Sequence, residues 1–163
     1  MDSKRGQDVV RASQRKEIKE KKEKLKTKRD YIKEAQVAFN AYVRFRDEKR
    51  PCISCGSILR QEEQKQGGLR DCGHYLSRGA YPDARHRFGL DNTASQCVKC
   101  NRYLGGNVAK FRLGMIERWG LDRVERIESD LPSSRMTIDY LQRLTKIFRK
   151  RLRIIKAIRN KKC

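Results

Sequence analysis

Four cysteines in two pairs are the residues whose types and spacing most directly indicate chemistry in this chain. Cys52-Ile-Ser-Cys55 and Cys97-Val-Lys-Cys100 are both Cys-x-x-Cys pairs. Each pair can form a tight knuckle that offers two sulfurs to one ion, and two knuckles complete the tetrahedral shell of a Zn²⁺ ion. A zinc ion with four protein ligands has no open position for water, so this zinc is expected to be structural and any chemistry falls to other residues.

Those other residues are His74, Asn92 and Asn101, which lie between and just after the cysteine pairs. An imidazole titrates near neutral pH, so His74 is expected to take a proton from the water that attacks phosphorus. The amide of Asn92 is expected to hold the imidazole, or the strand end that carries it, in orientation. The carbonyl oxygen of Asn101 suits a hard catalytic cation, Mg²⁺ or Mn²⁺. Each assignment has a structural alternative: a histidine on a strand is often structural, and Asn101 could merely cap the knuckle.

The order Cys-x-x-Cys, His, Asp-Asn, Cys-x-x-Cys-Asn resembles the zinc-stabilised HNH endonucleases, in the variant whose last member is Asn. More narrowly, the segments 72–79, 91–92, 96–102 and 106–107 resemble the NinG (Rap) recombination endonucleases of lambdoid phages. The resemblance implies an α+β fold with a small treble-clef ββα-metal core. It also implies cleavage of branched DNA, such as Holliday junctions and D-loops, during phage recombination.

The chain departs from the common HNH pattern at one position. Many HNH sites carry a metal-binding Asp directly before the His, and here that position is Gly73. Asp71 alternates to the same side of a strand as Gly73 and could reach the catalytic metal through a water. Asp91 and the backbone are further options for the metal shell.

Three regions are expected to position these residues. Residues 1–48 form a basic N-terminal helical arm, residues 49–107 the HNH-like zinc-bound core, and residues 108–163 a helical C-terminal region. The start of the arm is either a single solvated helix or a disordered basic segment that orders on nucleic acid. Apolar residues from Tyr31 onward recur at helical spacing and predict a helix that ends before Pro51.

Within the core the sequence predicts a short strand at 57–59, a turn at Gly67-Gly68 and a return strand at 69–76, with His74 near its end. Residues 77–96 have no clean period and predict a loop. A helix is expected to carry the second cysteine pair and Asn101.

Beyond the core, helices are predicted from Asn107 to Gly120, from Leu121 to Pro132 and from Thr137 onward. The last carries an apolar stripe at three- and four-residue steps, and its opposite face is basic. This stripe must be covered by the N-terminal helix of the same chain or by a second subunit, and we favour a homodimer.

Composition points to a nucleic-acid partner. The 41 Lys and Arg outnumber the 20 Asp and Glu, which gives a formal charge of +21, and such a chain repels itself unless an anion neutralises it. Hydrophobic residues make up 37% of the chain, which favours a compact centre with solvated arms. The candidate phosphate contacts are Arg78, Arg85, Arg87, Lys99 and Arg102. His86 is interpreted as a phosphate contact or a surface residue.

The remaining features narrow the class of protein. No apolar run is long enough to cross a bilayer, and the N-terminus MDSKRGQDVV lacks the apolar stretch of a signal peptide. We therefore expect a soluble intracellular protein without membrane association, in the bacterial host cytoplasm if the chain is phage-encoded. The expected intracellular location also favours zinc binding over disulfide formation by the cysteines. Cys72 is expected to be a small buried residue, and Cys163 to have no role.

The leading hypothesis is a metal-dependent, structure-specific DNA endonuclease. One alternative is a non-catalytic zinc-knuckle protein that binds nucleic acid through its basic helices. Another is an HNH nuclease that acts on linear duplex DNA.

Overall fold

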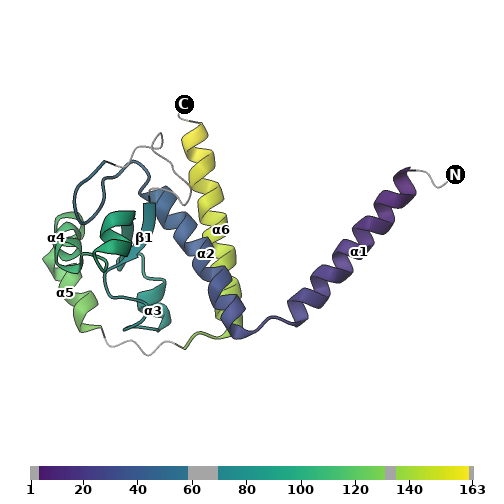
Figure 1. Cartoon of the computed structure of the whole chain (residues 1–163), viewed down its shortest axis with the longest axis horizontal. Coiled ribbons are helices and arrows are strands. Elements are labelled where there is room, and N and C mark those ends of the chain that lie inside the picture. Colours follow the sequence, from purple (N-terminus) through teal and green to yellow (C-terminus); the bar gives the residue numbers. More distant parts are fainter. Residues whose placement is uncertain (1–3, 59–69, 131–134, 162–163) are drawn as a thin grey trace.

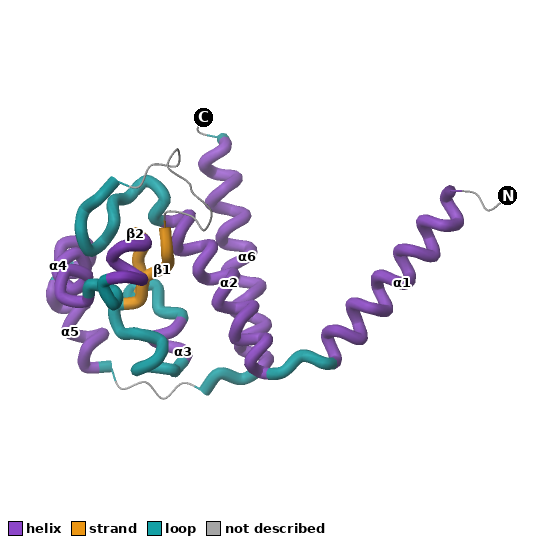
Figure 2. Tube along the Cα trace, viewed as in Figure 1, coloured by secondary structure: helices purple, strands orange, loops and turns teal. Residues whose placement is uncertain are grey.

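The computed structural model describes residues 4–58, 70–130 and 135–161. They form a helix-dominated α+β structure with a small sheet, which confirms the α+β part of the predicted fold class (Figures 1 and 2). The elements are α1 (Lys4–Lys24), α2 (Lys28–Arg46), β1 (Arg70–His74), α3 (Ala84–Arg87), β2 (Thr93–Cys97), the π-helix η2 (Lys99–Tyr103), α4 (Val108–Trp119), α5 (Leu121–Ser129) and α6 (Ile138–Asn160).

The sheet pairs β1 with β2 in antiparallel register, from Arg70 opposite Cys97 to His74 opposite Thr93. The prediction that β1 returns along a strand at 57–59 was therefore wrong: residues 57 and 58 are irregular, and Leu59 and the predicted turn lie outside the described residues. The predicted loop 77–96 was also wrong in part, since it contains α3 and most of β2. The sequence TASQC gives no strand signal because its buried residues are mostly polar.

The sheet separates two apolar cores. On one face Cys72 packs into a cluster with Phe39 of α2 and Phe148 of α6. On the other face Ala94 packs with Phe111 of α4 and with α5. Because side chains alternate along a strand, Cys72 and His74 face α2, whereas Asp71 and Gly73 face α4.

Helices α2 and α6 lie side by side and run in the same direction (Figure 1). Leu141 and Phe148 of α6 are buried against α2, so the helix of the same chain covers this part of the predicted stripe. Ile147, Ile154 and Ile158 of α6 remain 45–50% exposed. The predicted homodimer through this helix stays a prediction.

Helix α1 extends away from the rest of the molecule as a separate arm (Figure 2). Its described side chains are exposed, so the arm is the solvated helix that was one of the two predicted alternatives. The junction with α2 is fixed by Lys26, which forms ion pairs with Glu23 and Glu34, and by a capping box between Thr27 and Asp30. Among the described residues no helix has the length and apolar character that a membrane span requires.

Candidate functional site

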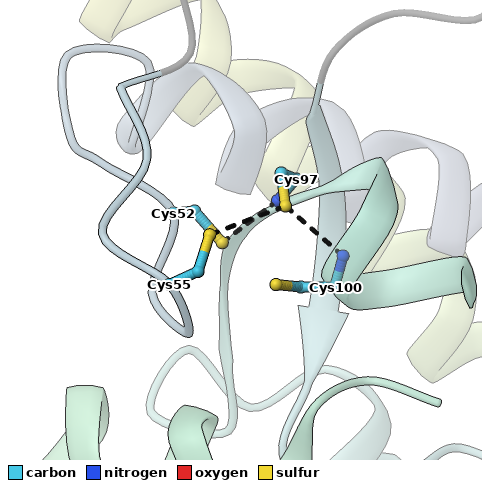
Figure 3. A group of neighbouring side chains, drawn as sticks. All are labelled: Cys52, Cys55, Cys97 and Cys100. Carbon is cyan, nitrogen blue, oxygen red and sulfur yellow. Dashed lines mark hydrogen bonds between the residues drawn. The ribbon is translucent and has the colours of Figure 1, made fainter. Parts of the chain in front are cut away.

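The four cysteines of the two pairs converge, as predicted. Their sulfur atoms all lie within 4.8 Å of one another, and those of Cys55 and Cys97 are 3.9 Å apart (Figure 3). Four sulfurs bound tetrahedrally at about 2.3 Å from a zinc ion are separated by about 3.8 Å. The cluster could therefore hold a zinc ion with only small shifts of its side chains.

Local hydrogen bonds build this cluster before any ion binds. The backbone N–H of Gly56 donates to the Cys52 carbonyl and closes the first knuckle. The backbone N–H groups of Cys97 and Cys100 donate to the sulfurs of Cys52 and Cys97, and the Asn107 amide donates to Cys100 Sγ at 3.4 Å. Donors of this kind favour thiolates, the form that binds metal.

The first knuckle is held against both β2 and α4. The backbone N–H of Ile53 donates to the Ser95 carbonyl of β2 at 3.1 Å. A Cβ atom on Gly114 of α4 would lie 2.0 Å from the Ile53 carbonyl oxygen, a distance that sterics forbid. The close approach of knuckle and helix therefore requires glycine at position 114.

Asp71 and Asn101, the proposed ligands of the catalytic metal, are brought together from different elements. The Asn101 Nδ2 of η2 donates to Asp71 Oδ2 of β1 at 3.0 Å. The guanidinium of Arg102 makes a bidentate contact with the same carboxylate, with both distances at 2.8 Å. Burial tends to raise the pKa of Asp71, but the hydrogen bonds from Arg102 and Asn101 outweigh it and lower the pKa. Asp71 is therefore a carboxylate.

Asp91, the other acidic candidate for this metal, is held elsewhere. Its carboxylate pairs with Arg85 at 2.9 Å and with Arg123 at 3.4 Å.

His74 is the last residue of β1, and its ring is fixed by a contact with the last residue of α3. Its Nε2 lies 3.0 Å from the Arg87 carbonyl oxygen. A carbonyl can only accept, so Nε2 carries the proton and Nδ1 is the basic nitrogen of the neutral ring. Burial and the nearby charges of Arg78 and Arg87 lower the pKa of His74 to about 4. The ring is thus neutral at physiological pH and a weaker base than a free imidazole, and an anion that offsets the charges of Arg78 and Arg87 would raise its basicity.

Two guanidinium groups beside His74 are free of carboxylate partners within the described part of the chain. Arg87 is half-buried, and its Nε is buried without a hydrogen-bond partner. Burial and the charge of Arg78 lower the pKa of Arg87. The partly desolvated charge of Arg87 is costly, and an anion bound to this guanidinium would offset that cost, whereas Arg78 is exposed.

Asn92 is completely buried and uses its whole amide. Its Oδ1 accepts from the Leu76 N–H, and its Nδ2 donates to the carbonyls of Leu76 and His86. Asn92 thus holds the segment that follows His74 against the end of α3. Of the two orienting roles predicted, the geometry fits the one that acts on the strand end.

The predicted site residues therefore form two groups. Asp71 and Asn101 are joined on the α4 face of β1, whereas His74 faces α2 and is joined to Arg87 and, through the following segment, to Asn92. A phosphodiester that touches both groups must pass around the end of β1, where His74 lies.

The other predicted residues have mixed environments. Arg85 is engaged by Asp91 and Asp130, at 2.9 and 3.0 Å, so its charge is already neutralised. Lys99 is exposed. Cys72 is buried as predicted, and burial raises the pKa of its thiol to about 12. Cys163 lies outside the described residues.

The interpretation of His86 as a surface residue or phosphate contact was wrong. Its side chain is 1% exposed, its Nδ1 lies 2.9 Å from Asp83 Oδ2, and its ring packs on Tyr81. Asp83 also caps the first turn of α3, so this histidine is part of the helix cap.

Two positioning residues carry no clear sequence signal. Asp47, 1% exposed, pairs with Arg46 and Arg118 and accepts from the Ser95 N–H, which ties α2, α4 and β2 together. Gln96, fully buried, donates to Ser54 Oγ of the first knuckle. A buried polar side chain cannot be told from an exposed one by residue type alone.

Comparisons with known proteins assign the chain to a family. A family model described as "Bacteriophage Lambda NinG protein" matches residues 2–159. The chain is 35% identical to "Protein ninG" of Salmonella phage P22 and 34% identical to "Protein ninG" of Escherichia phage lambda, each over 143 residues. In both cases the match covers 88% of this chain and 66% of the relative, so the chain spans less than two thirds of their length.

A third relative, "Protein ninG" of Enterobacteria phage H19B, is 38% identical over 122 residues, which are 75% of this chain and 56% of that protein. No solved structure matches the chain. The extent of the family match and the identity to these relatives show that this chain belongs to the NinG family of lambdoid phages.

Proposed function

We propose that this protein is a metal-dependent endonuclease that hydrolyses phosphodiester bonds in branched DNA, such as Holliday junctions and D-loops. One observation carries the proposal: a neutral His74 with a basic Nδ1 lies beside the unpaired charges of Arg78 and Arg87. A proton acceptor next to positive charge that attracts phosphate is what activation of a hydrolytic water needs. The resemblance to HNH endonucleases supports the same reaction, and the narrower resemblance to the NinG recombination endonucleases suggests branched DNA as its substrate.

The described core is compatible with a treble-clef ββα-metal arrangement. In this proposal β1 and β2 are the two strands, and η2, which follows the second cysteine pair, is the helix. A structural zinc bound by Cys52, Cys55, Cys97 and Cys100 would join the first knuckle to the end of β2 and to η2. It would thereby fix the position of Asn101 relative to Asp71.

In the proposed reaction Nδ1 of His74 takes a proton from water, the water oxygen bonds to phosphorus, and the bond from phosphorus to the leaving sugar oxygen breaks. Arg78 and Arg87 neutralise charge on the phosphate. Asn92 keeps the segment after His74 in place.

The residues present fit a catalytic cation. Asp71 and Asn101 both carry oxygen atoms, the ligands that Mg²⁺ and Mn²⁺ prefer, and they lie within one hydrogen bond of each other. When bound there, such an ion would supply stabilisation of the negative charge on the phosphate and on the leaving oxygen. Because the chain offers few ligands to this cation, water molecules would complete its coordination shell.

The rest of the molecule supplies non-specific affinity for DNA. The formal charge of +21 includes ten Lys and Arg after residue 140, with no acid among them. Most of these basic side chains are exposed on α6, and those of α1 are exposed on the free arm. We propose that these helices follow phosphate backbone outside the site, which predicts affinity that falls steeply with salt.

The test is a side-by-side digestion of a four-way junction, a D-loop and a linear duplex, with Mg²⁺, with Mn²⁺ and without added metal. We expect metal-dependent cutting of the branched substrates. His74→Ala should abolish cutting while junction binding and bound zinc persist. A His74→Ala protein that cuts as well as the unmodified chain would refute the assignment.

The same digestion separates the alternatives. A non-catalytic zinc-knuckle protein would bind all three DNAs and cut none with either metal. The separation of His74 and Asp71 on opposite faces of β1 is the observation that favours this alternative. Equal cutting of linear duplex and junction would instead indicate a nuclease without structural specificity.

A further inference from the structure

The carboxylate of Asp71 is occupied in this structure by hydrogen-bond donors. Arg102 Nε contacts Oδ2 and Arg102 Nη2 contacts Oδ1, both at 2.8 Å, and Asn101 Nδ2 contacts Oδ2 at 3.0 Å. These groups take up both oxygens of the carboxylate. The three hydrogen bonds leave one lone-pair position of the carboxylate, on Oδ1, and the positive charge of Arg102 beside it opposes binding of a cation there.

The orientation of Asn101 agrees with that of Arg102. Its nitrogen is directed at Asp71, whereas a metal ligand must present the amide oxygen. Binding of a cation by both Asp71 and the Asn101 amide oxygen therefore requires the amide to turn over, and departure of the Arg102 charge favours it. In this arrangement the positive charge beside the Asp71 carboxylate comes from the Arg102 guanidinium.

Arg102 is free to make this change. Its side chain is 52% exposed, whereas that of Asp71 is 15% exposed, so the arginine can swing into solvent while the carboxylate stays in place. A bidentate arginine–carboxylate pair contributes more to stability than an ordinary surface ion pair, so we expect Arg102 to leave Asp71 only for a partner of similar geometry. A DNA phosphate offers the same guanidinium a second bidentate partner of equal geometry.

We propose that Arg102 is a latch that holds the cation position at Asp71 in the DNA-free protein and moves to a DNA phosphate when substrate binds. Metal loading is then coupled to DNA binding. The inference rests on the proposed function, because it takes Asp71 and Asn101 as the metal ligands. It assigns Arg102 a positioning role beyond that of a phosphate contact.

The coupling has a reciprocal consequence. If DNA raises the affinity of the site for metal by a given factor, metal raises the affinity for DNA by the same factor. Removing the latch should raise the metal affinity of the free protein, because no guanidinium then competes. We expect about a threefold to tenfold gain, the range that loss of one exposed bidentate pair accounts for.

The experiment measures Mn²⁺ binding by electron paramagnetic resonance on the zinc-loaded full chain. The affinity is determined with and without a four-way junction, in a His74→Ala background that prevents cutting. Arg102→Gln removes the latch, and Arg102→Lys keeps the positive charge but cannot make the bidentate contact. The matched control is Arg112→Gln, because Arg112 makes a similar bidentate pair with Glu128, at 2.7 and 3.0 Å, away from Asp71.

For the free protein we expect Arg102→Gln to bind Mn²⁺ more tightly than the parent, Arg102→Lys to lie between them, and Arg112→Gln to match the parent. Adding the junction should tighten Mn²⁺ binding more in the parent than in Arg102→Gln. Asp71→Asn should remove the site in every case.

Each other outcome overturns the latch. If Arg102→Gln and the parent bind Mn²⁺ equally while Asp71→Asn does not bind, the latch is wrong and the metal site of the proposed function stands. If Arg102→Gln binds Mn²⁺ more tightly than the parent, but DNA raises its Mn²⁺ affinity by the same factor as in the parent, the proposed coupling of metal loading to DNA binding is wrong. If no Mn²⁺ binding depends on Asp71, with or without DNA, the proposed metal site fails together with the latch.

Discussion

Because the pKa of His74 is lowered in the folded protein, we predict that the free energy of unfolding depends on pH. The unfolded ring titrates near 6.5, whereas in the folded protein burial and the charges of Arg78 and Arg87 lower the pKa to about 4. Between these values the unfolded state binds more protons, so stability falls as the pH drops from 6.5 towards 4. At pH 5 this linkage amounts to about 2 kcal/mol less stability than at pH 7.5.

The perturbation is His74→Gln, which removes the titrating group and keeps a donor for the Arg87 carbonyl. Urea unfolding, followed by the fluorescence of Trp119, the single tryptophan, gives the free energy of unfolding of both proteins between pH 5 and 7.5. The difference between the two proteins should shift by about 2 kcal/mol across this range, with the unmodified chain losing more stability on acidification.

Two controls belong to this measurement. Thiols lose zinc on acidification, but excess zinc limits this loss and it affects both proteins alike. The other histidine, His86, is present in both proteins, so its contribution cancels in the comparison. Parallel stability curves for the two proteins would show that the His74 ring is not desolvated among positive charges. In that case His74 would not be the neutral base of the proposed reaction.

Two further predictions concern the phosphate site and the zinc knuckle. Arg87→Gln should lower the slope of log DNA affinity against log salt by about 1 without loss of stability, because it removes one phosphate contact and breaks no ion pair; an unchanged slope in salt-dependent binding assays would contradict this. Gly114→Ala should destabilise the protein by about 1–3 kcal/mol and speed loss of zinc to a chelator, because its Cβ meets the Ile53 carbonyl. Gly6→Ala on the exposed α1 is the control, since its Cβ meets no atom within 4 Å and should not destabilise the chain.

The cysteine cluster and the helices could be predicted because their signals are local. Each knuckle places its two sulfurs by its own three-residue spacing, and the sulfurs converge as expected. The helix from Asn107 to Gly120 was predicted by its apolar period and is observed as α4, although Val108 is 48% exposed and lies off the buried face. Periodicity predicts that a helix has an apolar face, but not how much of it a neighbour covers.

Strand β2 was missed because specific polar contacts, both near and distant in sequence, stabilise its buried residues. Ser95 donates its backbone N–H to Asp47, and the Thr93 hydroxyl donates to the Gly89 carbonyl. These partners satisfy buried polar groups that composition assigns to a loop. The same reason explains His86, whose burial depends on its contact with Asp83.

The sequence by itself determined the four sulfurs, the positive charge and the list of residues able to do chemistry, since these depend on residue type and near-neighbour spacing. Only the tertiary structure decided which of these residues meet. Asn101 and Arg102 reach Asp71 across thirty or so positions, and the Arg87 carbonyl fixes the tautomer of His74 from thirteen positions away. Such hydrogen bonds are directional and join segments that are far apart in sequence, so they exist only once β1, α3 and η2 have packed together.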